Sequence, residues 1–305
     1  MKIVTLTLSA AYDVHCIAKK ITAGSENFIK LTERNPGGKG INISRALNAF
    51  GVSNTAVVVL GEDNHDEYVS SLEKEGIALE KILVPSRIRE NITVHTSDGK
   101  ETRISFSAEE IPSGIMQSAK EITSKLTEGD VLTLTGSIPT GVSISDVKAY
   151  IKELRERGIR VVVDSRSLSL SDITDVKPYL IKPNEYEAET YLGRKITSDS
   201  DACQAARDFI ALGVENVMLT LGTRGAVLAT ADACYFSHAP KLDVLSTIGA
   251  GDSAIAGFIY AELLGLSKRD ALLYSIAFGS AACLRSGTKP PDKADVERIL
   301  KEFGE

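Results

Sequence analysis

Short apolar runs alternate with amphipathic segments along most of the chain. The runs typical of buried strands cover residues 2–8, 54–61, 130–136, 159–165, 178–184 and 216–222. Between them, residues 41–51, 146–158 and 201–213 carry apolar side chains at helical spacing. Strands that are apolar on both faces must be covered on both faces. The pattern therefore predicts an α/β fold, a mostly parallel sheet with helices on both faces.

Two regions interrupt this alternation. Residues 11–33 and 89–107 resemble alternating strands with no helix between them, and Asp98-Gly99 is a typical hairpin turn. We expect these strands to form a small separate sheet that projects from the main domain. The apolar face of such a sheet needs cover from the substrate, from the parent domain or from a second subunit.

Charge and cysteine content exclude several classes of protein. The 305 residues carry a net charge of -6, whereas proteins that bind nucleic acids or membrane surfaces present basic patches. No apolar run approaches the ~20 residues of a membrane span. The four cysteines lack paired spacing, which favours free thiols, and the interrupted apolar start suits a first strand better than a signal peptide. We therefore expect a cytoplasmic protein that binds neither nucleic acid nor membrane.

Ligands of open α/β sheets bind beyond the carboxyl ends of the strands. The polar or glycine-rich segments at these ends are the candidate loops. They read GSIPTG (136–141), DSRS (164–167), KPNEYE (182–187), TLGTRG (220–225) and STIGAGD (246–252).

The last of these loops, with Gly249 and Gly251, leads directly into a helical pattern. Glycines allow backbone amides to turn toward a ligand, and the helix adds its positive end, so an anion would bind here. Asp252 has two interpretations. It could cap the helix, or it could act as general base for a substrate hydroxyl beside a transferring phosphoryl group.

The segment NPGGKGINISRAL (35–47) is rich in glycine and precedes a helix. A P-loop requires Ser or Thr after the Gly-Lys pair, and residue 40 is Gly, so that interpretation fails. The absence of G-x-G-x-x-G after the first strand counts against a dehydrogenase. The segment is either a plain loop or a cradle for a polyhydroxylated or phosphorylated ligand, with Lys39 and Asn42 as polar groups.

The segment KPNEYE also has two interpretations. Asn184 and Glu187 supply hard oxygen ligands suited to Mg²⁺, through waters, while Lys182 could meet phosphates. The same Asn and Glu, three residues apart, are the pattern of a capping box at a helix start.

Taken in order, these segments resemble the ribokinase-like (PfkB) carbohydrate kinases from end to end. PGGKGINISRAL is similar to the first signature of that family, STIGAGDSAIAGF to the second, and KPNEYE to the N-x-x-E element between them. GSIPTG and TLGTRGA are similar to its other ligand loops. The resemblance implies a single ribokinase-like domain over residues 1–305, with lid strands inserted at about 9–33 and 87–110, and a kinase that uses ATP and Mg²⁺.

The resemblance also implies roles by position. Asp252 would be the catalytic base, with Gly249, Ala250 and Gly251 as its anion hole, and Asn184 and Glu187 would organise Mg²⁺. The nucleotide would contact Lys182, Asn184, Thr220, Gly222 and Gly225, with Ser280 near the adenine. The sugar would contact Asp13, Gly37, Gly38, Lys39, Asn42 and Ser137. The lid strands often also form a dimer interface, which implies a homodimer.

Within the family, TLTLSAAYD resembles the T-L-N-P-A-x-D start of the hexose-phosphate kinases, which include 1-phosphofructokinase, tagatose-6-phosphate kinase and the minor 6-phosphofructokinase. In this branch Arg89 falls near the lid arginine that binds the phosphate already on the sugar, as a guanidinium fork suits phosphate oxygens, and Lys39 could assist. A solvated Arg89 is the alternative, with Arg87 and Arg103 nearby. The chain departs from the branch at Ser9-Ala10 and at residues 105–110.

The leading hypothesis is thus phosphoryl transfer from MgATP to a hydroxyl of fructose 1-phosphate, fructose 6-phosphate or tagatose 6-phosphate. One alternative is a kinase for an unphosphorylated sugar or a nucleoside. Another is a non-catalytic sugar or nucleotide sensor, against which the retained Asp252, Gly249, Gly251 and Glu187 speak. A dehydrogenase is the weakest alternative.

Overall fold

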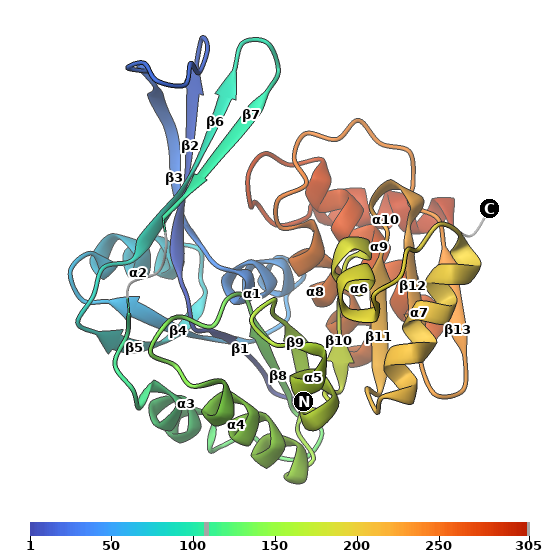
Figure 1. Cartoon of the computed structure of the whole chain (residues 1–305). Helices are drawn as coiled ribbons and strands as arrows, with labels where there is room; N and C mark the ends of the chain where they lie inside the picture. The colour runs from blue at the N-terminus through green and yellow to red at the C-terminus, as the bar shows by residue number, and fades with distance from the viewer. Residues whose placement is uncertain (107–109, 304–305) are drawn as a thin grey trace.

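A nine-stranded sheet forms the centre of the computed structural model, which describes residues 1–106 and 110–303 (Figure 1). Seven neighbouring strands pair in parallel, and at one edge β12 pairs antiparallel with both β11 and β13. The order across the sheet is β13 (Cys234–Ser237), β12 (Ala226–Ala229), β11 (Asn216–Thr220), β10 (Leu180–Ile181), β9 (Arg160–Asp164), β8 (Val131–Thr135), β1 (Ile3–Thr7), β4 (Thr55–Gly61) and β5 (Ala78–Val84). The predicted mostly parallel sheet is confirmed.

Helices cover both faces of this sheet, as its apolar strands require. One face packs against α3 (Ile115–Thr123), α4 (Ile144–Glu156), α5 (Leu170–Val176), α6 (Glu185–Leu192) and α7 (Asp199–Ala211). The other face packs against α1 (Lys39–Ala49), α8 (Ala250–Leu263), α9 (Lys268–Cys283) and α10 (Lys293–Glu302). Successive β1 residues alternate between the two cores, Ile3 entering one and Val4 the other. Within the described residues, no helix is long and apolar enough to cross a membrane.

A second, four-stranded sheet projects from the main body (Figure 1). Its order is β3 (Lys30–Gly37), β2 (Ala11–Ala18), β6 (Arg89–Thr96) and β7 (Glu101–Ser105). The predicted small sheet and its hairpin are confirmed, because β6 and β7 pair antiparallel around Asp98-Gly99, where Gly99 has a φ of 78°. At its base, β2 and β3 lie close to α2 (His65–Lys74), which packs beside them.

The two faces of the small sheet differ in chemistry. Directly paired residues share a face, so the register places Val14, Ile92 and Ile104 on one side. The other side carries polar residues, among them the directly paired Asp13 and Asn91. His15 belongs to this polar side, and its ring lies against Gly287 in the segment between α9 and α10. The polar face is therefore turned toward the C-terminal half of the chain.

Close packing of α8 on α9 fixes the helix that begins at the IGAGD segment. A β-carbon at Gly257 of α8 would lie 2.6 Å from the Tyr274 carbonyl oxygen of α9. Phe258 and Phe278 are buried in the same core. The missing side chain at Gly257 thus permits the close approach that holds α8 in place.

We predict that Gly257→Ala destabilises the protein, because the added methyl group would push two backbones apart. Overpacking of this kind costs about 1–3 kcal/mol, measurable as a lower midpoint of urea unfolding. Leu263→Ala is the control, since Leu263 lies near the end of the same helix and is 41% exposed. Equal midpoints for the two variants would contradict the prediction.

Candidate active site

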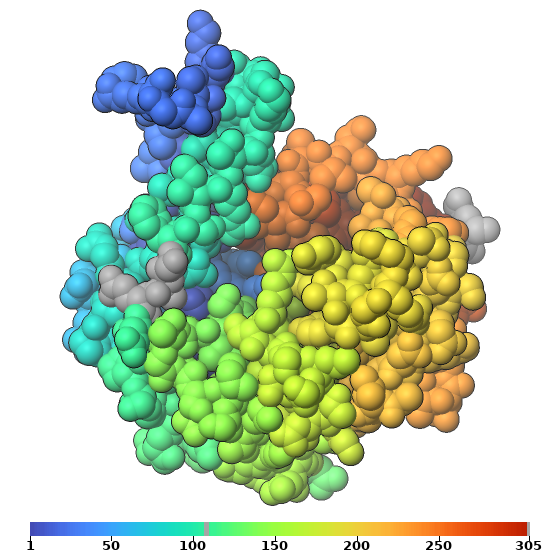
Figure 2. All heavy atoms as spheres, viewed as in Figure 1, coloured from blue at the N-terminus to red at the C-terminus, as the bar shows by residue number. Residues whose placement is uncertain are grey.

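The candidate loops meet at the carboxyl ends of the parallel strands. Asp164 ends β9, Lys182 and Asn184 follow β10, and Thr220 ends β11. Figure 2 shows a hollow between the small sheet, in blue and cyan, and the yellow and orange half of the chain. Ligand sites of open α/β sheets lie in this position.

Asp252 lies in the first turn of α8 and does not cap it. The N-cap residue is Gly249, with a φ of 79° and no side-chain hydrogen bond to the helix. The Asp252 carboxylate is 5% exposed, and its Oδ2 accepts a hydrogen bond of 2.8 Å from Asn42 Nδ2 of α1. The capping interpretation is therefore wrong. The first turn of α8, with Ala250 and Gly251, keeps the positive helix end free of a capping side chain.

Burial gives this carboxylate an unusual proton affinity. Desolvation raises the pKa of Asp252 to about 6, against the opposing effects of Lys39 and of the hydrogen bond from Asn42. A carboxylate with a pKa closer to neutrality is better suited to accept a proton from a hydroxyl group.

A second buried carboxylate, Asp164, lies close to Asp252. Its Oδ2 is 2.9 Å from Lys39 Nζ and 3.6 Å from Lys182 Nζ. Both lysines lower the pKa of Asp164, although desolvation alone would raise it. DSRS is among the candidate loops of the sequence, but no motif predicts a role for Asp164. Its position at the end of a buried strand was the available signal.

The glycine-rich segment before α1 brings several sugar-site candidates together. Gly37 ends β3, and a β-carbon there would lie 2.2 Å from Asp13 Oδ2, so the glycine makes room for the carboxylate. Gly38 is the N-cap of α1 at a φ of 129°. One turn later, Asn42 donates to Asp252 through Nδ2, while its buried Oδ1 lacks a partner among the described residues. A buried acceptor of this kind is available to a ligand hydroxyl.

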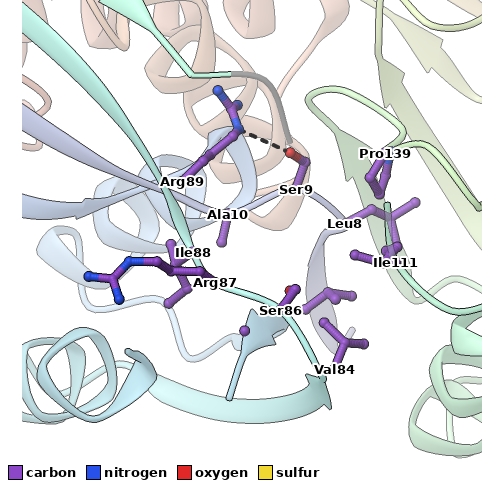
Figure 3. Close-up of a pocket in the computed structure, with 12 residues that line it drawn as sticks. Leu8, Ser9, Ala10, Val84, Ser86, Arg87, Ile88, Arg89, Ile111 and Pro139 are labelled. Atoms are coloured by element: carbon purple, nitrogen blue, oxygen red, sulfur yellow. Dashed lines mark hydrogen bonds between the residues drawn. The ribbon is translucent and has the colours of Figure 1, made fainter. Parts of the chain in front are cut away.

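Arg89 lies at the base of the small sheet with its guanidinium group held by neighbours. Nε donates to Ser9 Oγ at 3.3 Å (Figure 3), and Nη1 donates to Asn91 Oδ1 at 2.8 Å. Asn91 Nδ2 in turn donates to Asp13 Oδ1 at 3.1 Å. Desolvation lowers the pKa of Arg89, opposed by Asp13. One of the two departures from the branch pattern, Ser9-Ala10, therefore lies beside Arg89, since Ser9 accepts its hydrogen bond. The other departure, at 105–110, includes residues 107–109, which lie outside the described residues.

KPNEYE forms the capping box. Asn184 Oδ1 accepts from the Glu187 amide at 2.9 Å, and Glu187 Oε2 accepts from the Asn184 amide at 3.0 Å. The other carboxylate oxygen of Glu187 accepts from Arg166 Nε. Within the described residues, no group of three or more His, Cys, Asp or Glu side chains could hold a metal ion. One carboxylate oxygen still fits Mg²⁺ that is held mainly by waters and substrate phosphates.

Of the remaining candidates, Thr220 lies beside this loop, Ser280 lies on α9, and Ser137 lies in the loop after β8. Thr220 forms a parallel bridge with Asn184, and Gly222 begins a short 3₁₀ turn that ends before Gly225. Ser280 follows Gly279 on α9, where a β-carbon at Gly279 would be 3.1 Å from the Ala250 carbonyl oxygen. Ser137 is exposed in the loop after β8.

Comparison with known proteins decides the family. The model of the pfkB family carbohydrate kinases matches residues 3–295. The chain belongs to the pfkB family of carbohydrate kinases. It is 31% identical to 1-phosphofructokinase of Escherichia coli (strain K12) over 300 residues, which are 98% of this chain and 96% of that protein.

Solved structures agree with this membership. Phosphofructokinase-2 from Escherichia coli, in complex with substrates and products, matches at a TM-score of 0.94 and 27% identity over the whole of both chains. The tetrameric inhibited form of that protein matches at 0.90 and 26% identity, covering 100% of this chain and 99% of that one. The predicted ribokinase-like fold and ATP-dependent carbohydrate kinase class are confirmed.

Proposed function

We propose that this carbohydrate kinase transfers the γ-phosphoryl group of ATP to a hydroxyl of a hexose phosphate, with Asp252 as general base. The observation that carries the proposal is the buried Asp252 carboxylate beside the uncapped first turn of α8. A proton acceptor and an anion site are thus adjacent. Phosphoryl transfer to a hydroxyl group requires both. The names of the relatives support a fructose phosphate as acceptor.

The residues would act in one step. The Asp252 carboxylate takes the proton of the acceptor hydroxyl, whose oxygen then forms a bond to the γ-phosphorus while the bond to the leaving ADP oxygen breaks. The amides of Gly249, Ala250 and Gly251 at the start of α8 stabilise charge on the transferring group, for which the Ala250 amide gives up its 3.3 Å hydrogen bond to the Thr247 carbonyl oxygen. Lys182 faces the same group, because its Nζ lies 2.9 Å from where a Gly251 β-carbon would be. The transferring group therefore meets positive potential from two sides.

Recognition of the acceptor would come from the base of the small sheet. Asp13 is a hydroxyl acceptor at this face, and the linked Arg89 supplies a guanidinium fork for the phosphate already on the sugar. Arg89 is desolvated, which strengthens its attraction for an anion. We propose that the small sheet acts as a lid over the sugar and limits ATP hydrolysis by excluding water.

Glu187 would hold Mg²⁺ with the nucleotide phosphates, through the carboxylate oxygen that the capping box leaves and that Arg166 now contacts. When bound, the ion would neutralise charge on the ATP phosphates. Asn184 would orient Glu187 through the capping box.

ADP release with MgATP should reveal turnover of one compound among fructose 1-phosphate, fructose 6-phosphate and tagatose 6-phosphate. Asp252→Asn should lower kcat by about 10²-fold or more because the proton acceptor is lost. Arg89→Ala should raise mainly the sugar-phosphate KM, by about tenfold or more. Lys100→Ala is the matched cation control, since Lys100 is exposed on the β6–β7 hairpin.

Fructose, ribose and adenosine complete the panel and test the alternative. Turnover of only these unphosphorylated compounds, with no effect of Arg89→Ala, would replace the proposal by a kinase for a neutral acceptor. If no compound released ADP above the Asp252→Asn background, the proposed hexose-phosphate activity would be rejected.

Glu187→Gln should weaken binding of Mn²⁺, used as a paramagnetic substitute in the presence of ADP, by about tenfold or more, because a neutral amide attracts a cation less. Glutamine still fits a capping box, so α6 should persist. Asp201→Asn is the control, since Asp201 occupies the same capping-box position on α7. Equal Mn²⁺ affinity in both variants would remove Glu187 from the metal site.

We also propose that two copies associate through the small sheet. Leu31 and Ile104 are 56% and 50% exposed, and the register assigns Ile104 to the apolar face with Val14 and Ile92. An exposed apolar sheet face is typically covered by a partner.

Sedimentation velocity tests this assembly. The wild type should sediment as a dimer, and Ile104→Lys should sediment as a monomer, because a buried unpaired charge is costly. Leu264→Lys, at a 51% exposed position beyond α8, should remain dimeric. A monomeric wild type, or a dimeric Ile104→Lys, would refute the interface.

A further inference from the structure

Asp164 joins two loops that the proposed function assigns to different substrates. Lys39 belongs to the segment that would contact the sugar, and Lys182 to the segment that would contact ATP. Both ammonium groups lie within 3.6 Å of the same oxygen, Asp164 Oδ2. The Asp164 side chain is 6% exposed and that of Lys39 is 36% exposed, so the carboxylate is shielded from water while Lys39 stays partly open to the site.

The two lysines also lie close to the reacting groups. Lys182 Nζ approaches Gly251 in the first turn of α8. Lys39 and Lys182 both attract the Asp252 carboxylate, and Asp164 repels it. With Asn42 as the neutral neighbour, two lysines and two buried carboxylates form a charge-balanced cluster around Asp252.

We propose that Asp164 is a positioning residue that holds Lys39 and Lys182 in place together and so couples binding of the sugar phosphate to binding of ATP. This inference rests on the proposed function, because it assigns the two lysines to the two substrates of that reaction.

The physical reason lies in the side chains. A lysine ammonium is a point charge on a flexible stem, so its position depends on an anchor. Asp164 is such an anchor, since it ends a buried strand and its backbone carbonyl accepts from the Gly136 amide at 3.0 Å. Without the carboxylate, the buried Lys182 and the half-buried Lys39 would repel each other and separate. Each ammonium group would then occupy the position needed to contact its substrate for a smaller fraction of the time.

The test is Asp164→Asn, which keeps the shape of the side chain and removes the charge. Asp130→Asn is the matched control. Asp130 is also buried, at 5% exposure, but it precedes β8 at the opposite end of the sheet, where it accepts from the Lys2 and Thr127 amides. Both variants lose a buried carboxylate, and only one loses the link between lysines.

We expect Asp164→Asn to raise the KM for ATP and the KM for the sugar phosphate together, each by about tenfold or more, the ratio for one charge-assisted hydrogen bond. Asp130→Asn should lower the unfolding midpoint and leave both KM values unchanged. Isothermal titration with ADP alone should also give weaker binding for Asp164→Asn.

A pH profile separates positioning from stability. In the wild type, kcat/KM should fall below about pH 6, where Asp252 becomes protonated. Asp164 raises that pKa, so Asp164→Asn should move the acid limb to lower pH. The charged groups facing Asp252 are Lys39 from α1, Asp164 from β9 and Lys182 after β10. Asp130→Asn should not move the limb.

If Asp164→Asn does not fold, Asp164→Asn/Lys39→Met supplies the test, because it removes one charge of each sign. Compared with Lys39→Met alone, the double variant should further raise the ATP KM, or weaken ADP binding, because Lys182 also loses its ion pair with Asp164. The inference is overturned if Asp164→Asn leaves both KM values, ADP affinity and the acid limb unchanged, or if the double variant equals Lys39→Met. A wild type inactive on every sugar phosphate would reject the proposed function, and ADP binding would then decide the inference by itself.

Discussion

The site depends on one hydrogen bond between two helices that are distant in the sequence. Asn42 of α1 donates to Asp252 of α8, and both side chains are buried where the helices begin. Buried charges are stable only with partners, and Asp252 has Asn42 together with the cations Lys39 and Lys182. These partners offset only part of the effect of desolvation, so the pKa of Asp252 remains raised, as proton transfer requires. Close packing at Gly257 keeps α8, and therefore the carboxylate, in position.

The small sheet extends the same arrangement toward the acceptor. Strand alternation divides it into a polar face, where Asp13 and Asn91 lie in register, and an apolar face that includes Ile104. The polar face is the one proposed to contact the sugar, and the apolar face is the one proposed to contact a second copy. A one-residue slip between β2 and β6 would exchange the faces, which ties acceptor recognition to the register of this pair.

The sequence predicted the fold where local pattern and tertiary environment agree. The buried parallel strands, the Asp98-Gly99 hairpin and the helix after IGAGD were recognisable because each needs a distinct residue pattern. β5 was missed since this edge strand carries Glu80 and Lys81. β3 continues through Pro36 to Gly37, against the expectation for a proline-glycine segment, because an edge strand tolerates proline. Asp164 could not be given a role, since its meaning comes from two lysines that are 125 and 18 residues away.

KPNEYE shows why one motif can support two interpretations at once. The capping box uses Asn184 Oδ1 and Glu187 Oε2, so helix α6 begins where the sequence pattern indicates. The same two hydrogen bonds fix the direction of the remaining Glu187 oxygen, which Arg166 contacts at the edge of the site. A metal ligand must be oriented by its neighbours before it can bind with the right geometry. Capping and metal binding are therefore compatible, because the first supplies the rigidity that the second needs.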